Sequence, residues 1–391
     1  MRTLLGLFLV ALTAPAFSQT FQAQPLPNPA APGSLQANWS VTLDGSALLS
    51  WVEPSKDDSL TLRYAVRKGA AWSEVRTIAA NRHFFRHPAE VPEVMQLNDH
   101  LWMAHWVENP GEESDAEFVH VSSSTDGIHW TAPLMAHKDR GQVQHGLASM
   151  AADAKGEISI LWLFTPKGDD GPGYLMRTVV DATGKELKEE RLDPDVCDCC
   201  PTAVARTAKG LLVAYRSRTP QDIRDIAITR LENGKWSPSQ VIHADNWHIN
   251  ACPTNAASVS AKGDKVAVAW FTGAQNNPRV EIAFSSDSGA TFGKTTVVST
   301  GHAFGYTSVA LDDEGGALVS WLEDGPKATR VLARSVSAAG VAGPAVQVAE
   351  AGRSALGYPK VFHSAAGNFI AWGSARPGST SSKVETALLK K

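Results

Sequence analysis

The strongest constraint on the fold is a hairpin pattern that returns seven times along the chain. In each copy a turn of small or acidic residues leads into an apolar strand that ends in an aromatic residue, as in "VTLDGSALLSW" and "SVSAKGDKVAVAW". These aromatic residues are spaced 51 to 56 residues apart and are Trp51, Trp106, Trp162, Tyr215, Trp270, Trp321 and Trp372. Two further short strand-like runs follow most copies. Four antiparallel strands per repeat at this period predict the blades of an all-β propeller.

Two turns inside the repeats carry a family resemblance. "SSDSGATF" (residues 285–292) and the shorter "STDGIHW" (residues 124–130) resemble the Asp box of the sialidase-like, BNR-repeat β-propellers. The resemblance implies a propeller of four-stranded blades over nearly the whole chain. Seven hairpins favour seven blades, and six blades, as in the family sialidases, are the alternative. The Asp box caps a turn between the third and fourth strands and implies no chemistry by itself.

The N-terminus predicts export. Basic Arg2, an apolar run over residues 4–12 and small residues after it are typical of a signal peptide over residues 1–18. We therefore expect a periplasmic or secreted protein, with an N-terminal extension over residues 19–34 and a single propeller domain over residues 35–391. The net charge is −4 and no basic block is present, so we expect no nucleic-acid partner and no membrane partner. The sequence does not predict the oligomeric state.

The four cysteines occur in two related segments. Cys197, Cys199 and Cys200 belong to "DVCDCCPT", and Cys252 belongs to "NACPT". Cys200 and Cys252 each begin a Cys-Pro-Thr tripeptide where the innermost strand of a blade is predicted to start. The blade alignment places one residue per repeat at this axial position, in the series His145, Cys200, Cys252, Tyr306 and Tyr358. The cysteines are therefore predicted to meet at the mouth of the central channel.

A cluster of thiols and imidazoles predicts a site for a soft metal ion, copper first and zinc as the alternative. The predicted ligands are His145, Cys197, Cys199, Cys200, Cys252 and His248. Two other interpretations stay open. Exported chains commonly oxidise their cysteines, and a Cys200–Cys252 disulfide would clip adjacent blades and leave no metal site. A dithiol centre that cycles between thiols and a disulfide is the third possibility.

The resemblance to sialidases implies a different chemistry. Family members hold a substrate carboxylate with arginines and use a tyrosine nucleophile that is polarised by a glutamate. In this chain the implied substrate-binding residues are Arg216, Arg218 and Arg224. The implied catalytic set is Arg216, Arg218, Tyr306 and Glu323, with Tyr358 and Glu108 as substitutes. This chain carries Cys-Cys-Pro-Thr where family sialidases begin the same strand with a catalytic glutamate.

These observations favour a metal-binding or metal-dependent redox propeller that acts on a small molecule or an anionic glycan. The alternatives are an exo-α-sialidase-type glycoside hydrolase and a non-catalytic interaction propeller with structural disulfides.

Overall fold

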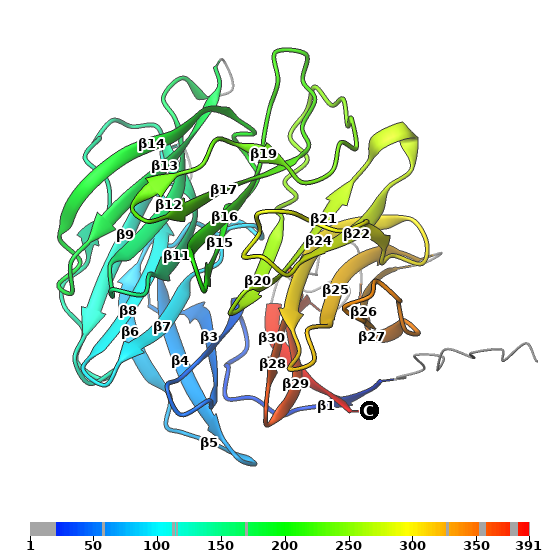
Figure 1. Cartoon of the computed structure of the whole chain (residues 1–391). Coiled ribbons are helices and arrows are strands. Elements are labelled where there is room, and N and C mark those ends of the chain that lie inside the picture. The colour runs from blue at the N-terminus through cyan, green and yellow to red at the C-terminus, as the bar shows by residue number, and fades with distance from the viewer. Residues whose placement is uncertain are drawn as a thin grey trace, which may run out of the picture.

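The computed structural model describes residues 21–56, 59–111, 114, 116–168, 171–325, 328–351, 357–375 and 382–390. In these ranges the chain forms seven antiparallel sheets that are arranged as the blades of a propeller (Figure 1). The all-β propeller and its seven blades are thus confirmed. The predicted signal peptide lies outside the described ranges. No helix in the described part of the chain is both long and apolar enough to cross a membrane.

The first four blades follow the chain in order. Blade 1 contains β2 (Leu35–Val41), β3 (Ala47–Pro54), β4 (Leu60–Lys68), β5 (Ala71–Trp72) and β6 (Arg76–Arg82). Blade 2 contains β7 (Glu93–Asn98), β8 (Leu101–Glu108), β9 (Phe118–Ser124) and β10 (Leu134–Met135). Blade 3 contains β11 (Gln144–Ala152), β12 (Ile158–Thr165), β13 (Gly173–Val180) and β14 (Glu186–Val196). Blade 4 contains β15 (Ala203–Thr207), β16 (Gly210–Arg216), β17 (Ile226–Glu232), β18 (Lys235–Trp236) and β19 (Gln240–Val241).

The last three blades complete the ring. Blade 5 contains β20 (Ser258–Lys262), β21 (Lys265–Thr272), β22 (Arg279–Ser285) and β23 (Thr296–Val297), with a 3-10 turn, η2 (Ala274–Asn276), after β21. Blade 6 contains β24 (Ala303–Leu311), β25 (Ala317–Asp324), β26 (Thr329–Val336) and β27 (Val346–Ala351). Blade 7 contains β28 (Lys360–Ser364), β29 (Gly367–Ala375), β30 (Ser382–Lys390) and β1 (Gln22–Pro25).

Blade 7 is built from both ends of the chain. Strand β1 pairs antiparallel with β30, in a register that places Gln22 opposite Lys390 and Pro25 opposite Ala387. The segment predicted as an N-terminal extension therefore supplies the outermost strand of this blade. This pairing joins the two ends of the described chain in one blade and so closes the ring.

The repeated aromatic residues lie in the second strands, near their C-terminal ends, and pack between blades. Trp51, Trp106 and Trp321 are fully buried. Each indole Nε1 donates a hydrogen bond to the glutamate two residues later, over 2.7 Å in Trp106–Glu108 and 2.9 Å in Trp321–Glu323. A buried indole needs such an acceptor, because an unsatisfied N–H costs free energy. The Trp-x-Glu pattern is therefore part of the packing between blades.

The two Asp boxes lie where the resemblance places them, between third and fourth strands. In the turn between β22 and β23, Ser285 Oγ donates to Asp287 Oδ1 over 2.7 Å and accepts from the Gly289 amide over 2.9 Å. In the turn between β9 and β10, Ser124 and Asp126 make the equivalent bond over 3.0 Å. Both boxes are structural turns.

Candidate functional site

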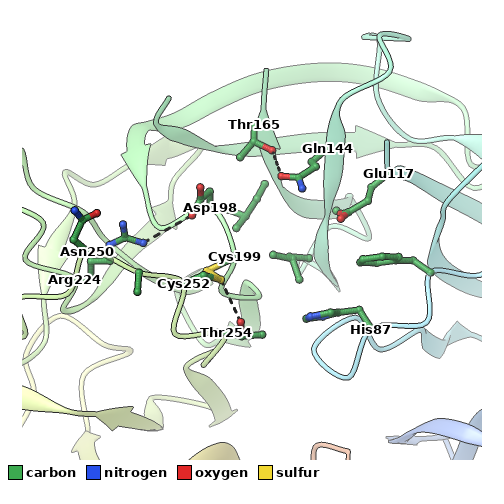
Figure 2. Close-up of a pocket in the computed structure, with 15 residues that line it drawn as sticks. His87, Glu117, Gln144, Thr165, Asp198, Cys199, Arg224, Asn250, Cys252 and Thr254 are labelled. Carbon is green, nitrogen blue, oxygen red and sulfur yellow. Dashed lines mark hydrogen bonds and ion pairs between the residues drawn. A yellow bond between two sulfur atoms is a disulfide. The ribbon is translucent and has the colours of Figure 1, made fainter. Parts of the chain in front are cut away.

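A cavity of about 520 Å³ opens at the face where the innermost strands of several blades begin (Figure 2). Its lining comes from consecutive blades: Gln144 starts β11, Cys199 lies between β14 and β15, and Cys252 lies before β20. Glu117 precedes β9 and Arg224 precedes β17. The cavity therefore lies among the loops of blades 2 to 5, and of the five predicted axial residues only Cys252 lines it.

The structure brings all four cysteines together at this cavity. Cys199 and Cys252 form a disulfide with a Cα–Cα separation of 6.0 Å. Cys197 Sγ lies 3.8 Å from Cys199 Sγ and 3.3 Å from Cys200 Sγ, so the four sulfur atoms form one continuous group. The pairing considered from the sequence, Cys200–Cys252, is corrected. Cys200 is turned into the protein beside Cys197, and Cys199 faces Cys252 instead.

Arg224 sets the electrostatics of the buried thiols. Its Nη1 donates to Cys197 Sγ over 3.4 Å, and Nη2 donates to Asp222 Oδ1 over 3.4 Å. The hydrogen bond between the two thiols lowers the pKa of Cys197 to about 6, and the charges of Arg216 and Arg224 lower it further, whereas burial raises it. Burial and the neighbouring Cys197 raise the pKa of Cys200. One thiol of the pair is therefore favoured as a thiolate and the other as a proton donor. We call Cys197, Cys199, Cys200, Cys252 and Arg224 the sulfur wall.

The two histidines predicted as metal ligands do not join the cysteines in the structure. The His145 ring is buried, with Nε2 2.9 Å from Asp139 Oδ1, and it stacks on His137 with the ring centres 4.1 Å apart. His248 is exposed in the loop after β19. The mutually close ligand atoms at the cavity belong to Cys197, Cys199 and Cys200. The predicted six-residue shell is thus not assembled, because the His145 imidazole is engaged by Asp139 and His137, His248 is exposed in a loop, and two of the sulfur atoms are bonded to each other.

The predicted substrate-binding arginines are held by the protein. The Arg216 side chain is buried, and its guanidinium donates to the carbonyl oxygens of Asn255, Arg224 and Phe271 over 2.7 to 3.2 Å. Arg218 forms a 2.9 Å ion pair with Asp222. Of the three predicted arginines, Arg224 alone lines the cavity. Arg216 therefore fixes the loops behind the sulfur wall, and its buried guanidinium does not line the cavity where a substrate carboxylate would lie.

The predicted tyrosine–glutamate pair is also separate in the structure. Tyr306 stacks on Tyr358 with the ring centres 4.2 Å apart, and Tyr358 Oη donates to the Thr254 carbonyl over 2.7 Å. Glu323 is buried and accepts hydrogen bonds from Trp321 and Thr300.

Glu108 has the equivalent place in blade 2, where it accepts from the Trp106 indole. Glu323 and Glu108 therefore belong to the packing between blades, and their contacts leave no nucleophile–carboxylate pair of the sialidase kind.

A pair of carboxylates at the cavity has no motif in the sequence. A Cβ added to Gly146 would lie 2.1 Å from Glu117 Oε2 and 3.4 Å from Glu90 Oε2, so both carboxylates occupy the space that this glycine leaves open. Glu90 accepts hydrogen bonds from the amides of Leu147 and Ala148. Burial, followed by the charge of Glu117, raises the pKa of Glu90 to about 8. We call Glu90, Glu117 and Gly146 the carboxylate wall.

The backbone beside this pair is irregular. Leu147 has a φ of +55°, which a side chain with a Cβ rarely adopts, and it lies in the bulge of β11 between Gly146 and Ser149. Such strain is concentrated at functional sites. A glycine that follows the predicted axial residue His145 was the one sequence signal that pointed to this wall.

Comparisons with known proteins agree with this architecture. Residues 52–369 match the BNR repeat-like domain. The chain belongs to the BNR repeat-like domain family. No curated protein matches the chain.

Three solved structures show how widely the fold of this BNR-repeat propeller is used. The GH93 α-L-arabinofuranosidase of Fusarium graminearum, in complex with arabinobiose, is 12% identical with a TM-score of 0.52, covering 94% of this chain and 98% of its own. The polysaccharide lyase Uly1 is 9% identical with a TM-score of 0.54, covering 97% and 94%. The BP39L lectin from Burkholderia pseudomallei is 12% identical with a TM-score of 0.57, covering 92% and 97%. At these identities the likeness concerns the fold alone.

Proposed function

We propose that this BNR-repeat propeller is a carbohydrate-active protein whose cavity binds an uncharged oligosaccharide and hydrolyses a glycosidic bond. The observation that carries the proposal is the carboxylate wall, where Glu117 faces the cavity and Glu90 lies buried behind the same glycine. When two carboxyl groups lie close together, their pKa values move apart, so that one stays protonated and the other is ionised. Acid–base chemistry on sugars requires one group in each form.

The rest of the lining suits a sugar. Planar polar side chains surround the cavity, among them Gln144, whose amide oxygen accepts a 2.7 Å hydrogen bond from Thr165 (Figure 2). Phe85 and His87 stack with their ring centres 5.5 Å apart and add a flat surface to the lining. A few fixed polar groups beside flat apolar surface are the general pattern of a small-molecule site. The arabinobiose complex and the lectin show that related propellers bind carbohydrates.

The charges of the lining favour an uncharged ligand over the anionic glycan expected from the sequence. Glu117 and Asp198 both line the cavity. The one guanidinium there, Arg224, is already engaged by Cys197 and Asp222 and lies 3.9 Å from Asp198. An acidic sugar would add its own negative charge to a lining that already contains these two carboxyl groups.

The chemistry that we propose uses one proton held by the carboxylate pair. Glu117 passes this proton to the glycosidic oxygen as the bond from that oxygen to the anomeric carbon breaks. Water adds to the anomeric carbon and returns its proton to the pair, so that the pair ends with the proton it began with. Glu90 does not line the cavity and acts through Glu117 as a positioning residue.

The test is hydrolysis by the mature protein of a panel of uncharged oligosaccharides that includes arabinobiose, with a sulfated glucuronyl-rhamnose oligosaccharide as the charged comparison. We expect release of reducing ends from an uncharged member and a loss of about 100-fold or more in Glu117→Gln. Glu74→Gln is the matched control, because the Glu74 side chain is exposed on the surface. Unchanged hydrolysis in Glu117→Gln, or cleavage of the charged oligosaccharide alone, contradicts the proposal.

The copper or zinc site predicted from the sequence is a second candidate. One observation favours it: the sulfur atoms of Cys197, Cys199 and Cys200 lie within 4.8 Å of one another. Such a site requires the Cys199–Cys252 disulfide to be reduced. Elemental analysis of protein purified without chelator tests it: near-stoichiometric metal that is lost in Cys200→Ser supports the site, and metal-free protein contradicts it.

A further inference from the structure

We propose that the sulfur wall is a two-electron relay in which a buried Cys197–Cys200 dithiol exchanges with the cavity-facing Cys199–Cys252 disulfide and thereby reduces a disulfide-bearing partner. The relay goes beyond the carbohydrate function and does not depend on it. The relay needs only sulfur atoms for its chemistry. The feature of the partner that it recognises is a disulfide bond.

The sulfur contacts carry the inference. Cys197 and Cys200 are both 1% exposed and have the Cys-x-x-Cys spacing of redox-active dithiols, with their sulfur atoms 3.3 Å apart. The other pair, Cys199 and Cys252, is already bonded and lines the cavity. Cys197 Sγ contacts both pairs, because it lies 3.8 Å from Cys199 Sγ. A buried dithiol and an accessible disulfide are thus joined through one atom.

Cys197 is placed as the attacking group. Arg224 donates to its sulfur over 3.4 Å, and the Arg224 side chain is itself buried. A thiolate is the nucleophile in disulfide exchange, and a neighbouring guanidinium stabilises that form. A disulfide that only tied two loops together would need neither the buried dithiol nor this buried arginine. The arrangement therefore contains the groups that thiol–disulfide exchange requires: a stabilised thiolate, a second thiol and a disulfide within contact.

The internal exchange conserves electrons. Cys197 thiolate attacks Cys199 Sγ, a Cys197–Cys199 bond forms, and Cys252 leaves as a thiolate. Cys200, after losing its proton to Cys252, attacks Cys197 Sγ, so that Cys197–Cys200 becomes the disulfide and Cys199 is released. One disulfide and two thiols are present before and after. The cavity now presents the Cys199–Cys252 dithiol, which the buried pair has reduced.

The partner reaction follows at the exposed end. Cys252 attacks one sulfur of a partner disulfide and forms a mixed disulfide, and the partner's other sulfur leaves. Cys199 then attacks Cys252, which restores the Cys199–Cys252 bond and releases the second partner sulfur. The partner gains two electrons and the one proton that Cys200 supplied, and its second sulfur takes a proton from water. The protein ends with two disulfides. Cys252 is exposed, so a partner can reach it.

The experiment uses oxidised glutathione as the probe on the mature protein. We expect about two glutathione thiols to be released per chain, and peptide mapping after acid quenching to show both Cys197–Cys200 and Cys199–Cys252 linkages. Release of no glutathione, with Cys197 and Cys200 still free, would overturn the relay. Copper or zinc held by four unmodified sulfur atoms in the purified protein would overturn it as well.

Two variants separate the relay from direct oxidation of the buried pair. In the Cys199→Ala, Cys252→Ala double variant, Cys197 and Cys200 keep their contact with each other, and Cys197 keeps its contact with Arg224. The buried dithiol has lost its route to the cavity, and we expect glutathione release to be lost. In Cys200→Ser the exchange stops at Cys197–Cys199, so we expect about one glutathione to be released and one to remain on Cys252. Circular dichroism checks that each variant folds. Release from the double variant at the rate of the unmodified protein contradicts the relay.

Discussion

The cavity has two walls that differ in how their chemistry arises. The sulfur wall contains cysteines, a residue type that can form disulfides and undergo exchange, and the structure decides which sulfur atoms bond to each other. The carboxylate wall uses a common residue type, and burial beside a second carboxylate makes Glu90 unusual. The residue type alone is thus enough to indicate the sulfur wall in the sequence. The carboxylate wall is recognised only from its surroundings, because burial and a neighbouring charge change the pKa of a common residue.

The walls also differ in what supports them. Behind the sulfur wall, the Arg216 guanidinium is bonded to three carbonyl oxygens and lies 4.9 Å from the ring centre of Trp247. The carboxylate wall depends on an absent side chain, since Gly146 leaves the room that Glu117 fills. Substitutions behind the sulfur wall should therefore lower the free energy of unfolding. Substitutions in the carboxylate wall should alter proton binding and ligand binding.

The largest effect is expected from Arg216→Met. Loss of the guanidinium leaves three buried carbonyl oxygens without donors, and we expect the free energy of unfolding to fall by about 3–5 kcal/mol. Arg218→Met is the matched control, because its ion pair with Asp222 is partly exposed, and we expect a change of about 1 kcal/mol or less. Denaturant unfolding measures both. Equal effects of the two variants would show that Arg216 is not a support of the sulfur wall.

A smaller, pH-dependent effect is expected at the carboxylate wall. The folded protein raises the pKa of Glu90 to about 8, so between about pH 5 and about pH 8 the folded state holds a proton that the unfolded state releases. Stability should therefore fall as the pH rises through this window, by about 1 kcal/mol per pH unit, and level off above it.

Glu90→Gln should flatten that decline, since it removes the titrating group. Glu117 and Glu93, whose charges contribute to the raised pKa of Glu90, remain in the variant. Denaturant unfolding at a series of pH values and fixed ionic strength measures the difference. Parallel curves for the variant and the unmodified protein would show that Glu90 is ionised in the folded state.

The fold was largely predictable because its determinants repeat. An aromatic residue near the end of each second strand and a turn before it occur at near-constant spacing, and each of the seven marks a blade. Strand β1 escaped prediction because four residues without a hairpin partner nearby carry no pattern. Its partner β30 lies at the other end of the chain, and such pairing depends on closure of the whole ring.

The site was predictable only in part, for reasons that differ between its walls. Four cysteines in 391 residues, two of them in one repeated tripeptide, mark the sulfur wall. Their pairing depends on which side chain of the Cys199–Cys200 dipeptide faces the cavity, and the sequence does not encode that direction in any simple pattern.

The carboxylates escaped because the chain has 40 acidic residues and no motif surrounds Glu90 or Glu117. Glu323 entered the predicted catalytic set through the sialidase resemblance, as the partner of a tyrosine. Its packing role beside Trp321, which Glu108 repeats beside Trp106, is visible only in three dimensions.

The most direct test of the central claim, that one cavity has two independent walls, is calorimetric binding of an uncharged oligosaccharide from the panel to three proteins side by side. These are the unmodified protein, Glu117→Gln, and the Cys199→Ala, Cys252→Ala double variant. The account predicts binding weakened about tenfold or more in Glu117→Gln, as the loss of a hydrogen bond to a charged group implies, and changed by no more than about threefold in the double variant. Loss of binding in the double variant, with binding retained in Glu117→Gln, would contradict it.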